Sequence, residues 1–219
     1  MKLYGEKKIE EVFKEIDEHL EDKTEAYLLG GGAMIQHDFK TATKDIDLVL
    51  DKQEYLTTLT STLKKIGYET VPELESSYEK MKAKKVLERE NSPRFDIFLE
   101  IVCKKLVLSE GIKKRSSNFI DLDKLTIKIL SKEDIFLFKI VATRERDMED
   151  ASRLVESGLD WSVIVNETDE QSDHTERKWF PLLYQSIEEL EQEYSQECPV
   201  KDEIYQRAMK DLEDVNLPS

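Results

Sequence analysis

Apolar residues near the start of the chain recur every three or four positions, which is the spacing of an amphipathic helix. This first predicted helix places its apolar side chains at Ile9, Val12, Phe13, Ile16 and Leu20. The same spacing predicts a second helix over 56–66, which ends at Gly67. Shorter apolar or alternating runs indicate strands at 26–29, 45–50, 68–71, 85–89, 94–99 and 124–130. The first half of the chain is therefore expected to mix helices with strands.

A helical pattern dominates the second half of the chain. The predicted helices there cover 131–143, 147–157, 160–170, 177–197 and 200–215. Ser131 and Asp134 have the spacing of a helix N-terminal capping signal, and residues 101–115 in the first half are also predicted as helix. Together these patterns predict an α+β fold. Residues 1–130 would form a domain with a mixed β-sheet flanked by helices, and residues 131–219 a helical domain packed on it.

One segment joins three glycines to a pair of carboxylates. Gly30 to Gly32 follow an apolar strand, and Asp45 and Asp47 open the next strand, beginning thirteen residues after Gly32. Because side chains two apart in a strand share a face, both aspartates point the same way, while Ile46 points into a core. Neighbouring carboxylates repel each other unless a cation lies between them. Mg²⁺ is the usual cation where phosphates are also bound, so the segment predicts a site for a metal-bound triphosphate.

Asp96 offers a third carboxylate on the strand predicted at 94–99. Its apolar neighbours Phe95 and Ile97 share one face of that strand, and Asp96 lies on the other. The run at 85–89 is expected to form a hairpin with this strand. If the hairpin lies beside the strand of Asp45, three carboxylates converge. Nucleotidyl transfer with two metal ions, held roughly 3.5–4 Å apart, requires such an arrangement.

Simpler interpretations of these residues stay open. Gly30 to Gly32 can be a tight turn between a strand and a helix, because glycine tolerates backbone conformations that other residues avoid. Asp45 and Asp47 can lie on a solvated edge strand. Two commoner glycine motifs do not match: no Lys-Ser/Thr follows at the spacing of a P-loop, and the dinucleotide-binding fingerprint requires a glycine where Ile35 stands.

Lys139 is a cation within an apolar run, 135–142, of the kind that forms a buried helix. A buried lysine is costly unless it meets an anion. That anion is either a nucleotide phosphate or a metal-site carboxylate, or else a structural partner such as Asp147 or Asp150. Lys44, which precedes the first aspartate of the pair, either contacts a phosphate or lies on the surface.

The net charge of −15 over 219 residues argues against chain-wide binding of nucleic acid, which requires cations. The charge is unevenly distributed. Residues 78–118 contain eleven Lys or Arg against six Asp or Glu, whereas residues 186–219 contain three against ten. The basic residues of 80–115 would guide tRNA or another RNA to the site, or they are solvated lysines on helix faces.

Several classes of protein are disfavoured by composition. No run approaches the roughly 18 continuous apolar residues of a membrane span, and the N-terminus lacks the apolar region of a secretion signal. Cys103 and Cys198 are isolated, so neither a disulfide framework nor a zinc site is indicated. The expected location is the reducing cytoplasm, and no membrane partner is expected.

The glycines, the paired aspartates and the isolated Asp96 occur in an order that resembles the nucleotidyltransferase superfamily, which includes DNA polymerase β. Gly32 and Asp45 are separated by twelve residues, as in that motif. Within the superfamily, the chain resembles small prokaryotic nucleotidyltransferases, a group with toxin-like members in phage defence and toxin–antitoxin systems. The segment from Lys139 to Asp150 resembles the Lys…Ala-x-Arg-x-Arg-Asp-x-x-Asp pattern of that toxin-like branch. The resemblance covers roughly residues 25–155.

This resemblance implies transfer of a nucleoside monophosphate from ATP or another NTP to an acceptor hydroxyl, with release of pyrophosphate. The implied catalytic and metal-binding residues are Asp45, Asp47 and Asp96, which would hold two Mg²⁺ ions, with Mn²⁺ as an alternative. The implied nucleotide-binding residues are Gly30, Gly31, Gly32, Lys44 and Lys139. The acceptor is RNA or tRNA, a protein, or a small molecule. Two other functions stay open: a nucleotide-binding module without turnover, and a toxin–antitoxin interaction protein whose acidic C-terminal helices dock a basic partner.

Overall fold

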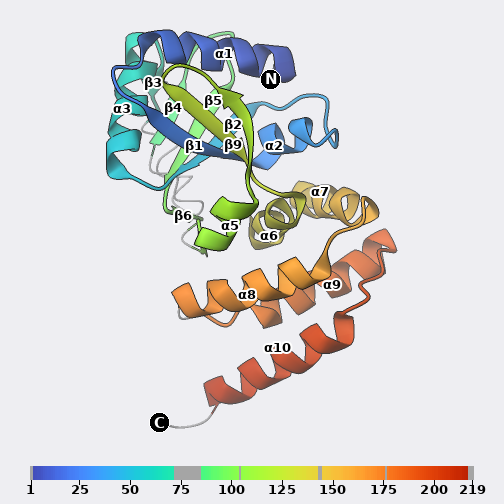
Figure 1. Cartoon of the computed structure of the whole chain (residues 1–219). Coiled ribbons are helices and arrows are strands. Elements are labelled where there is room, and N and C mark those ends of the chain that lie inside the picture. The colour runs from blue at the N-terminus through green and yellow to red at the C-terminus, as the bar shows by residue number, and fades with distance from the viewer. Residues whose placement is uncertain (1, 72–84, 104, 143–144, 176, 217–219) are drawn as a thin grey trace. The chain divides into compact units, whose positions relative to one another are not determined.

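The computed structural model describes residues 2–71, 85–103, 105–142, 145–175 and 177–216 (Figure 1). The chain divides into two compact units, Met1–Ser131 and Lys132–Ser219. The first unit is built on a mixed sheet, and the second consists of helices in its described part.

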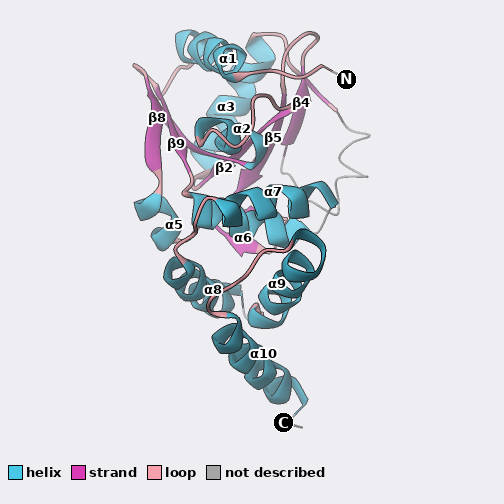
Figure 2. Cartoon of the chain, turned by 90° about the vertical axis from the view of Figure 1, so that its right-hand side faces the viewer, coloured by secondary structure: helices cyan, strands magenta, loops and turns pink. Residues whose placement is uncertain are grey.

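The sheet has nine strands within the described residues. Its main path runs in the order β3-β4-β5-β2-β1-β9-β8, and β6 and β7 continue from β5. In Figure 2, β8 and β9 lie at one side of the sheet and β4 and β5 at the other. The strands are β1 (Thr24–Leu29), β2 (Asp45–Leu50), β3 (Glu69–Thr70), β4 (Lys85–Glu88), β5 (Arg94–Leu99), β6 (Ile101–Val102), β7 (Leu106–Val107), β8 (Ser117–Asp121) and β9 (Leu125–Ile129).

Both parallel and antiparallel ladders hold the centre of the sheet. Strand β1 pairs antiparallel with β2 and parallel with β9, and β2 pairs parallel with β5. The hairpin predicted from 85–89 and 94–99 is confirmed, because β4 pairs antiparallel with β5. The central strands are apolar on the face that packs inward, and Ile46, Leu48 and Leu50 are fully buried. Their burial follows from the period-two alternation of a strand.

Two amphipathic helices cover one face of the sheet. Helix α1 (Glu6–His19) contacts β9 and α3 (Gln53–Lys65), and α3 contacts β1, β2 and β5. The ring of Phe13 on α1 meets the ring of Phe95 on β5 edge to face, with centroids 6.4 Å apart. Since alternate residues of a strand face opposite ways, Asp96 points away from these helices. Both helices were predicted from their apolar spacing, and they are confirmed.

The helix predicted over 101–115 is wrong for most of its length. The chain there forms β6 and β7 and then the short helix α5 (Glu110–Arg115). Glu100 and Cys103 have left-handed backbone angles, with φ of 58° and 56°, which a continuous helix does not allow. Helix α5 begins only after Ser109, whose side chain accepts a hydrogen bond from a backbone N–H of its first turn. Strand β8 was not predicted.

The second unit follows the predicted helical pattern, and its helices begin and end within a few residues of the predicted positions. They are α6 (Lys132–Ala142), α7 (Glu145–Glu156), α8 (Trp161–Thr175), α9 (Phe180–Tyr194) and α10 (Lys201–Asn216). Helix α6 contacts α7, α8 and α9, and α9 contacts α10. Ser195 ends α9 in a left-handed conformation, with φ of 55°. Among the described residues, no helix is both long enough and apolar enough to span a bilayer.

Candidate active site

The structure brings the three predicted carboxylates together on one face of the sheet. Asp45 and Asp47 lie on β2, and the parallel ladder places Asp47 beside Asp96 on β5. Residues paired in neighbouring strands point to the same face, so all three side chains lie on the face opposite α1 and α3. Asp45 and Asp47 are half-buried, whereas Asp96 is only 1% exposed. The arrangement concentrates negative charge at the N-terminal ends of two parallel strands.

Arg94 supplies positive charge within this group. It pairs with Asp45 in the ladder, and its guanidinium forms a bidentate contact with Asp96, Nε to Oδ1 at 2.7 Å and Nη2 to Oδ2 at 2.8 Å. Its Nη2 is also 3.1 Å from Oδ2 of Asp45. A buried carboxylate is costly without a charged partner, and Arg94 provides one for Asp96. The sequence patterns did not single out Arg94. Its two-residue spacing from Asp96 would have placed both side chains on one face.

Two of the three glycines lie against side chains at the site. Gly30 has a left-handed φ of 61°, and a Cβ atom there would lie 2.2 Å from Oδ2 of Asp47. A Cβ atom on Gly31 would lie 2.4 Å from Oγ1 of Thr43. Gly32 has a packing role instead, because its Cβ would meet the side chain of Leu28 at 2.9 Å. Only glycine fits the backbone angle and the close contact at Gly30.

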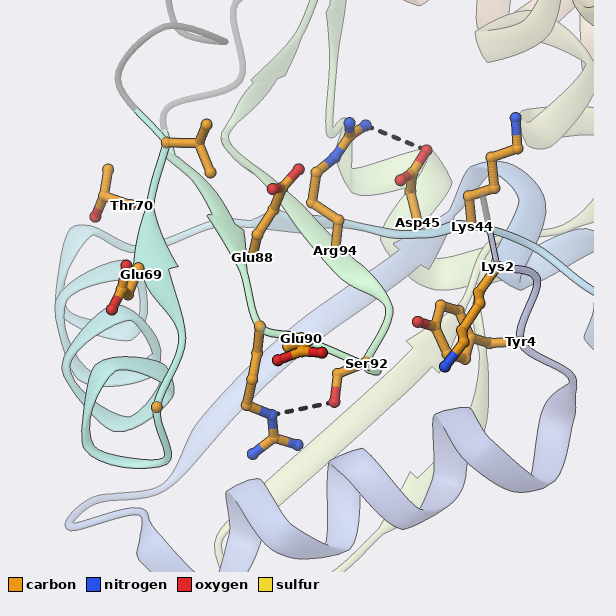
Figure 3. Close-up of a pocket in the computed structure, with 13 residues that line it drawn as sticks. Lys2, Tyr4, Lys44, Asp45, Glu69, Thr70, Glu88, Glu90, Ser92 and Arg94 are labelled. Carbon is orange, nitrogen blue, oxygen red and sulfur yellow. Dashed lines mark hydrogen bonds and ion pairs between the residues drawn. The ribbon is translucent and has the colours of Figure 1, made fainter.

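A cavity of about 920 Å³ in the first unit is lined by one of the three carboxylates, Asp45 (Figure 3). Lys44 and Arg94 line it together with Asp45. Its lining continues over β4 and β3, where Glu88 and Glu69 carry further carboxylates. The cavity therefore extends from the aspartate-bearing strands toward the edge of the sheet.

Lys139 belongs to the second unit, where it makes structural ion pairs. Its Nζ lies 2.8 Å from Oδ1 of Asp147 and 2.7 Å from Oδ2 of Asp150, both on α7. Burial lowers the pKa of Lys139 and the two carboxylates raise it, with a net upward direction. These are the ion pairs with Asp147 and Asp150 that the sequence offered as the structural alternative to a contact with a phosphate or a metal-site carboxylate. Of the two nearby arginines in the motif, Arg146 is exposed, and Arg144 lies outside the described residues.

The basic stretch at 80–115 is only partly described. Lys80, Lys82, Lys84 and Lys104 lie outside the described residues. Lys113 is engaged by carboxylates, with its Nζ 3.2 Å from Asp51 and 3.1 Å from Glu110. A basic surface for RNA therefore stays a prediction, as does a protein-binding role for the acidic C-terminal helices.

The carboxylate oxygens at the candidate site are chemically suited to bind a divalent cation. Carboxylate oxygens are the ligands that Mg²⁺ prefers, and Asp45, Asp47 and Asp96 present them on one face. Among the described residues, however, no group of three or more His, Cys, Asp or Glu side chains is placed so that it could hold a metal ion. Arg94 is ion-paired with both Asp45 and Asp96, so a cation entering there would compete with its guanidinium.

The fold is that of a nucleotidyltransferase-type protein. Residues 7–195 match the family described as "Nucleotidyltransferase of unknown function (DUF6036)", and the chain belongs to this family. The resemblance to the nucleotidyltransferase superfamily is thereby confirmed, as is the predicted α+β fold with helices flanking a mixed sheet.

A solved structure has a similar fold. It is the crystal structure of ANT(2″)-Ia in complex with adenylyl-2″-tobramycin, with a TM-score of 0.50 and 15% sequence identity. The match covers 76% of this chain and 96% of that chain. At this identity the likeness concerns the fold alone. No curated protein sequence matches the chain significantly.

Proposed function

We propose that the protein transfers a nucleoside monophosphate from an NTP to an acceptor hydroxyl and releases pyrophosphate. The register of β2 against β5 carries this proposal, because it places Asp47 beside Asp96 and keeps Asp45 on the same face. Membership of a nucleotidyltransferase family supports the same reaction class. The similar ANT(2″)-Ia structure holds an adenylylated ligand, adenylyl-2″-tobramycin, which is consistent with such a transfer.

The carboxylates and glycines have separate roles in this proposal. Asp45, Asp47 and Asp96 would hold two Mg²⁺ ions, or Mn²⁺, which supply Lewis acidity to the phosphate and to the attacking hydroxyl. Gly30 and Gly31 have no room for a side chain, because a Cβ atom would meet Asp47 at the first and Thr43 at the second. The NTP phosphates would approach the bare backbone N–H groups there.

The chemistry balances within a single displacement. The acceptor oxygen bonds to the α-phosphorus while the bond from that phosphorus to the bridging oxygen breaks, and pyrophosphate leaves with the electron pair. The hydroxyl proton passes to Asp96. Arg94 is a positioning residue in this scheme, because its bidentate contact fixes the orientation of the Asp96 carboxylate.

The test supplies each of the four NTPs separately with Mg²⁺ and measures pyrophosphate release. Pooled tRNA, protein and small hydroxyl compounds serve as acceptors. The double variant Asp45→Asn and Asp47→Asn should reduce transfer by at least about 100-fold, the scale for removing a transition-state charge partner. Asp22→Asn, a change at an exposed acid outside the site, is the control and should leave transfer unchanged. Unaltered transfer by the double variant would overturn the proposal.

A second candidate function is a nucleotide-binding module without turnover. The ion pairs of Arg94 favour it, because they engage Asp45 and Asp96 with a guanidinium rather than a metal. Calorimetric titration with each NTP separates the two functions. Tight binding of an NTP that stays intact with every acceptor supports the binding module, whereas pyrophosphate release excludes it.

A further inference from the structure

The loop that leads into β2 is held by backbone hydrogen bonds to two other segments. Thr43 forms an isolated antiparallel bridge with Tyr4, in which the Tyr4 N–H donates to the Thr43 carbonyl at 2.7 Å and the Thr43 N–H donates to the Tyr4 carbonyl at 2.9 Å. One residue later, the carbonyl of Lys44 accepts a hydrogen bond from the N–H of Arg94 at 3.3 Å. Tyr4 also lines the cavity together with Asp45 (Figure 3). The start of β2 is therefore tied both to the residues before α1 and to β5.

The side chain of Thr43 lies between two parts of the candidate site. Its hydroxyl donates a hydrogen bond to the backbone carbonyl of Asp45 at 3.2 Å. The same Oγ1 atom lies against Gly31, in the space that a Cβ atom on that residue would need. Threonine hydroxyls often bond to backbone groups a few residues away, and this one also touches a second segment of the chain. One side chain thus contacts both the glycines and the first aspartate.

The glycine turn, Gly30 and Gly31, therefore meets the start of β2 at two points. A Cβ atom on Gly30 would collide with the carboxylate of Asp47, and a Cβ atom on Gly31 would collide with Thr43. The contact at Asp47 alone would fix one distance and leave the turn able to pivot about it. The second contact, at Thr43, removes that freedom. Thr43 also holds the backbone of Asp45, so it links the position of the turn to the position of this carboxylate.

We propose that Thr43 is a positioning residue for NTP binding, because it sets the separation between the glycine turn and Asp45. This inference rests on the proposed function, in which one triphosphate is held at both places. The affinity for a ligand that spans two groups depends on the distance between them. A hydroxyl has one proton, and that of Thr43 is donated to the Asp45 carbonyl. The side chain therefore acts by holding the site in shape rather than by donating to a phosphate.

Two substitutions separate the hydroxyl of Thr43 from its shape. Thr43→Ser keeps the hydroxyl and loses a methyl group, so it should keep the bond to the Asp45 carbonyl. Thr43→Val keeps the branched shape but places a methyl group against Gly31, where it cannot donate and takes more room. Thr57→Val is the matched control. Thr57 is exposed on α3, and its hydroxyl donates to the backbone carbonyl of Gln53 at 3.0 Å, so the same chemical change removes the same kind of bond away from the site.

Calorimetry on the full chain would measure the affinity for ATP, CTP, GTP and UTP separately, each with Mg²⁺. For the NTP that the wild type binds, Thr43→Val should bind at least about tenfold more weakly, the scale of a small misplacement in a site. Thr43→Ser and Thr57→Val should bind as the wild type does. A second pair tests the backbone bridge. Tyr4→Pro and Tyr4→Ala both remove the ring, but only proline removes the N–H that donates to Thr43, so Tyr4→Pro should bind the NTP more weakly than Tyr4→Ala.

The outcomes separate this inference from the proposed function. Wild-type affinity in Thr43→Val, equal losses in Thr43→Ser and Thr43→Val, or an equal loss in Thr57→Val overturns the positioning role, whether or not pyrophosphate is released. Affinity that is lost in Thr43→Val and kept in Thr43→Ser, without pyrophosphate release for any acceptor, supports the positioning role and overturns the proposed transfer. Absence of NTP binding by the wild type overturns both. Melting curves of all variants check that each of them folds.

Discussion

Replacing Lys139 by methionine should strongly destabilise the second unit. Lys139 is 9% exposed, and Asp147 and Asp150 are 7% and 3% exposed. The substitution keeps most of the side-chain volume but removes the lysine that pairs with both buried carboxylates, while Arg153, 3.8 Å from Asp150, stays in place. Removing one partner of a buried ion pair costs about 3–5 kcal/mol. We expect a loss within that range, because Lys139 makes the shortest ion pairs of both acids, and Arg153 lies 3.8 Å from Asp150.

The chain offers a built-in probe for this measurement. Both of its tryptophans, Trp161 and Trp179, lie in the second unit, so tryptophan fluorescence during urea unfolding reports on that unit. Trp161 packs edge to face against Phe136 on α6, the helix that carries Lys139. For a chain of this size, each kcal/mol shifts the melting temperature by roughly 2–4 °C. The expected shift is therefore on the order of 10 °C.

Two variants control the interpretation. Lys210→Met removes an exposed lysine of α10 and should cost almost nothing. Adding Asp147→Asn and Asp150→Asn to Lys139→Met should recover much of the loss, because the buried charges are then removed together. A loss below about 1 kcal/mol for Lys139→Met alone would refute the reasoning, since that is the range of a surface pair.

The pH dependence of this cluster has a defined sign. Burial lowers the pKa of Lys139 and the carboxylates raise it, with a net direction above its ordinary value of 10.5. The stabilisation is therefore fully present below pH 10.5 and is lost as the pH rises through the raised pKa. The stability difference between wild type and Lys139→Met should stay constant around neutral pH and shrink as the pH rises through the raised pKa of Lys139.

Three further changes test other parts of the structure. Gly30→Ala should lower both stability and NTP binding in calorimetry, because its Cβ would lie 2.2 Å from Oδ2 of Asp47 at a φ of 61°; unchanged binding would contradict the close contact. Hydrogen bonds from Arg89 lower the pKa of Glu15 below its ordinary 4.5, so their stabilisation is present above pH 4.5 and is lost as the pH falls through the lowered pKa. Glu15→Gln should then be less stable than wild type at neutral pH and approach it in acid, as urea titrations under both conditions would show. Ser109→Ala should cost about 1 kcal/mol in urea unfolding, because the cap of α5 is lost; no change would mean that the cap contributes nothing.

Local periodicity predicted most of the elements, because each central strand and each long helix buries one regular face. The alternation around Asp45 and Asp47 and around Asp96 sufficed to place three carboxylates on one side of the sheet. It could not predict β8, whose single buried residue is Ile120 and whose ladder contains a register shift. The apolar residues of 101–115 fit a helical spacing, and only the tertiary structure shows the turns within them.

The charges of the site were harder to predict than its strands. The role of Arg94 depends on its register beside Asp45, which lies 49 residues earlier in the chain. The opposed pair of Glu69 and Glu88 likewise depends on a ladder between two short strands. A single sequence contains no local signal for such pairings, because they are fixed by the order of strands in the sheet.

The parallel ladder between β1 and β9 has a consequence for biosynthesis. Thr24 pairs with Leu125, about a hundred residues later, and a ribosome adds roughly 5–20 residues per second. The nascent β1 therefore waits roughly 5–20 seconds for one of its two neighbours. During that interval its apolar edge is open to chaperones or to other nascent chains. The helices that emerge afterwards contact one another across shorter stretches of chain than β1 and β9 do, and such contacts form faster.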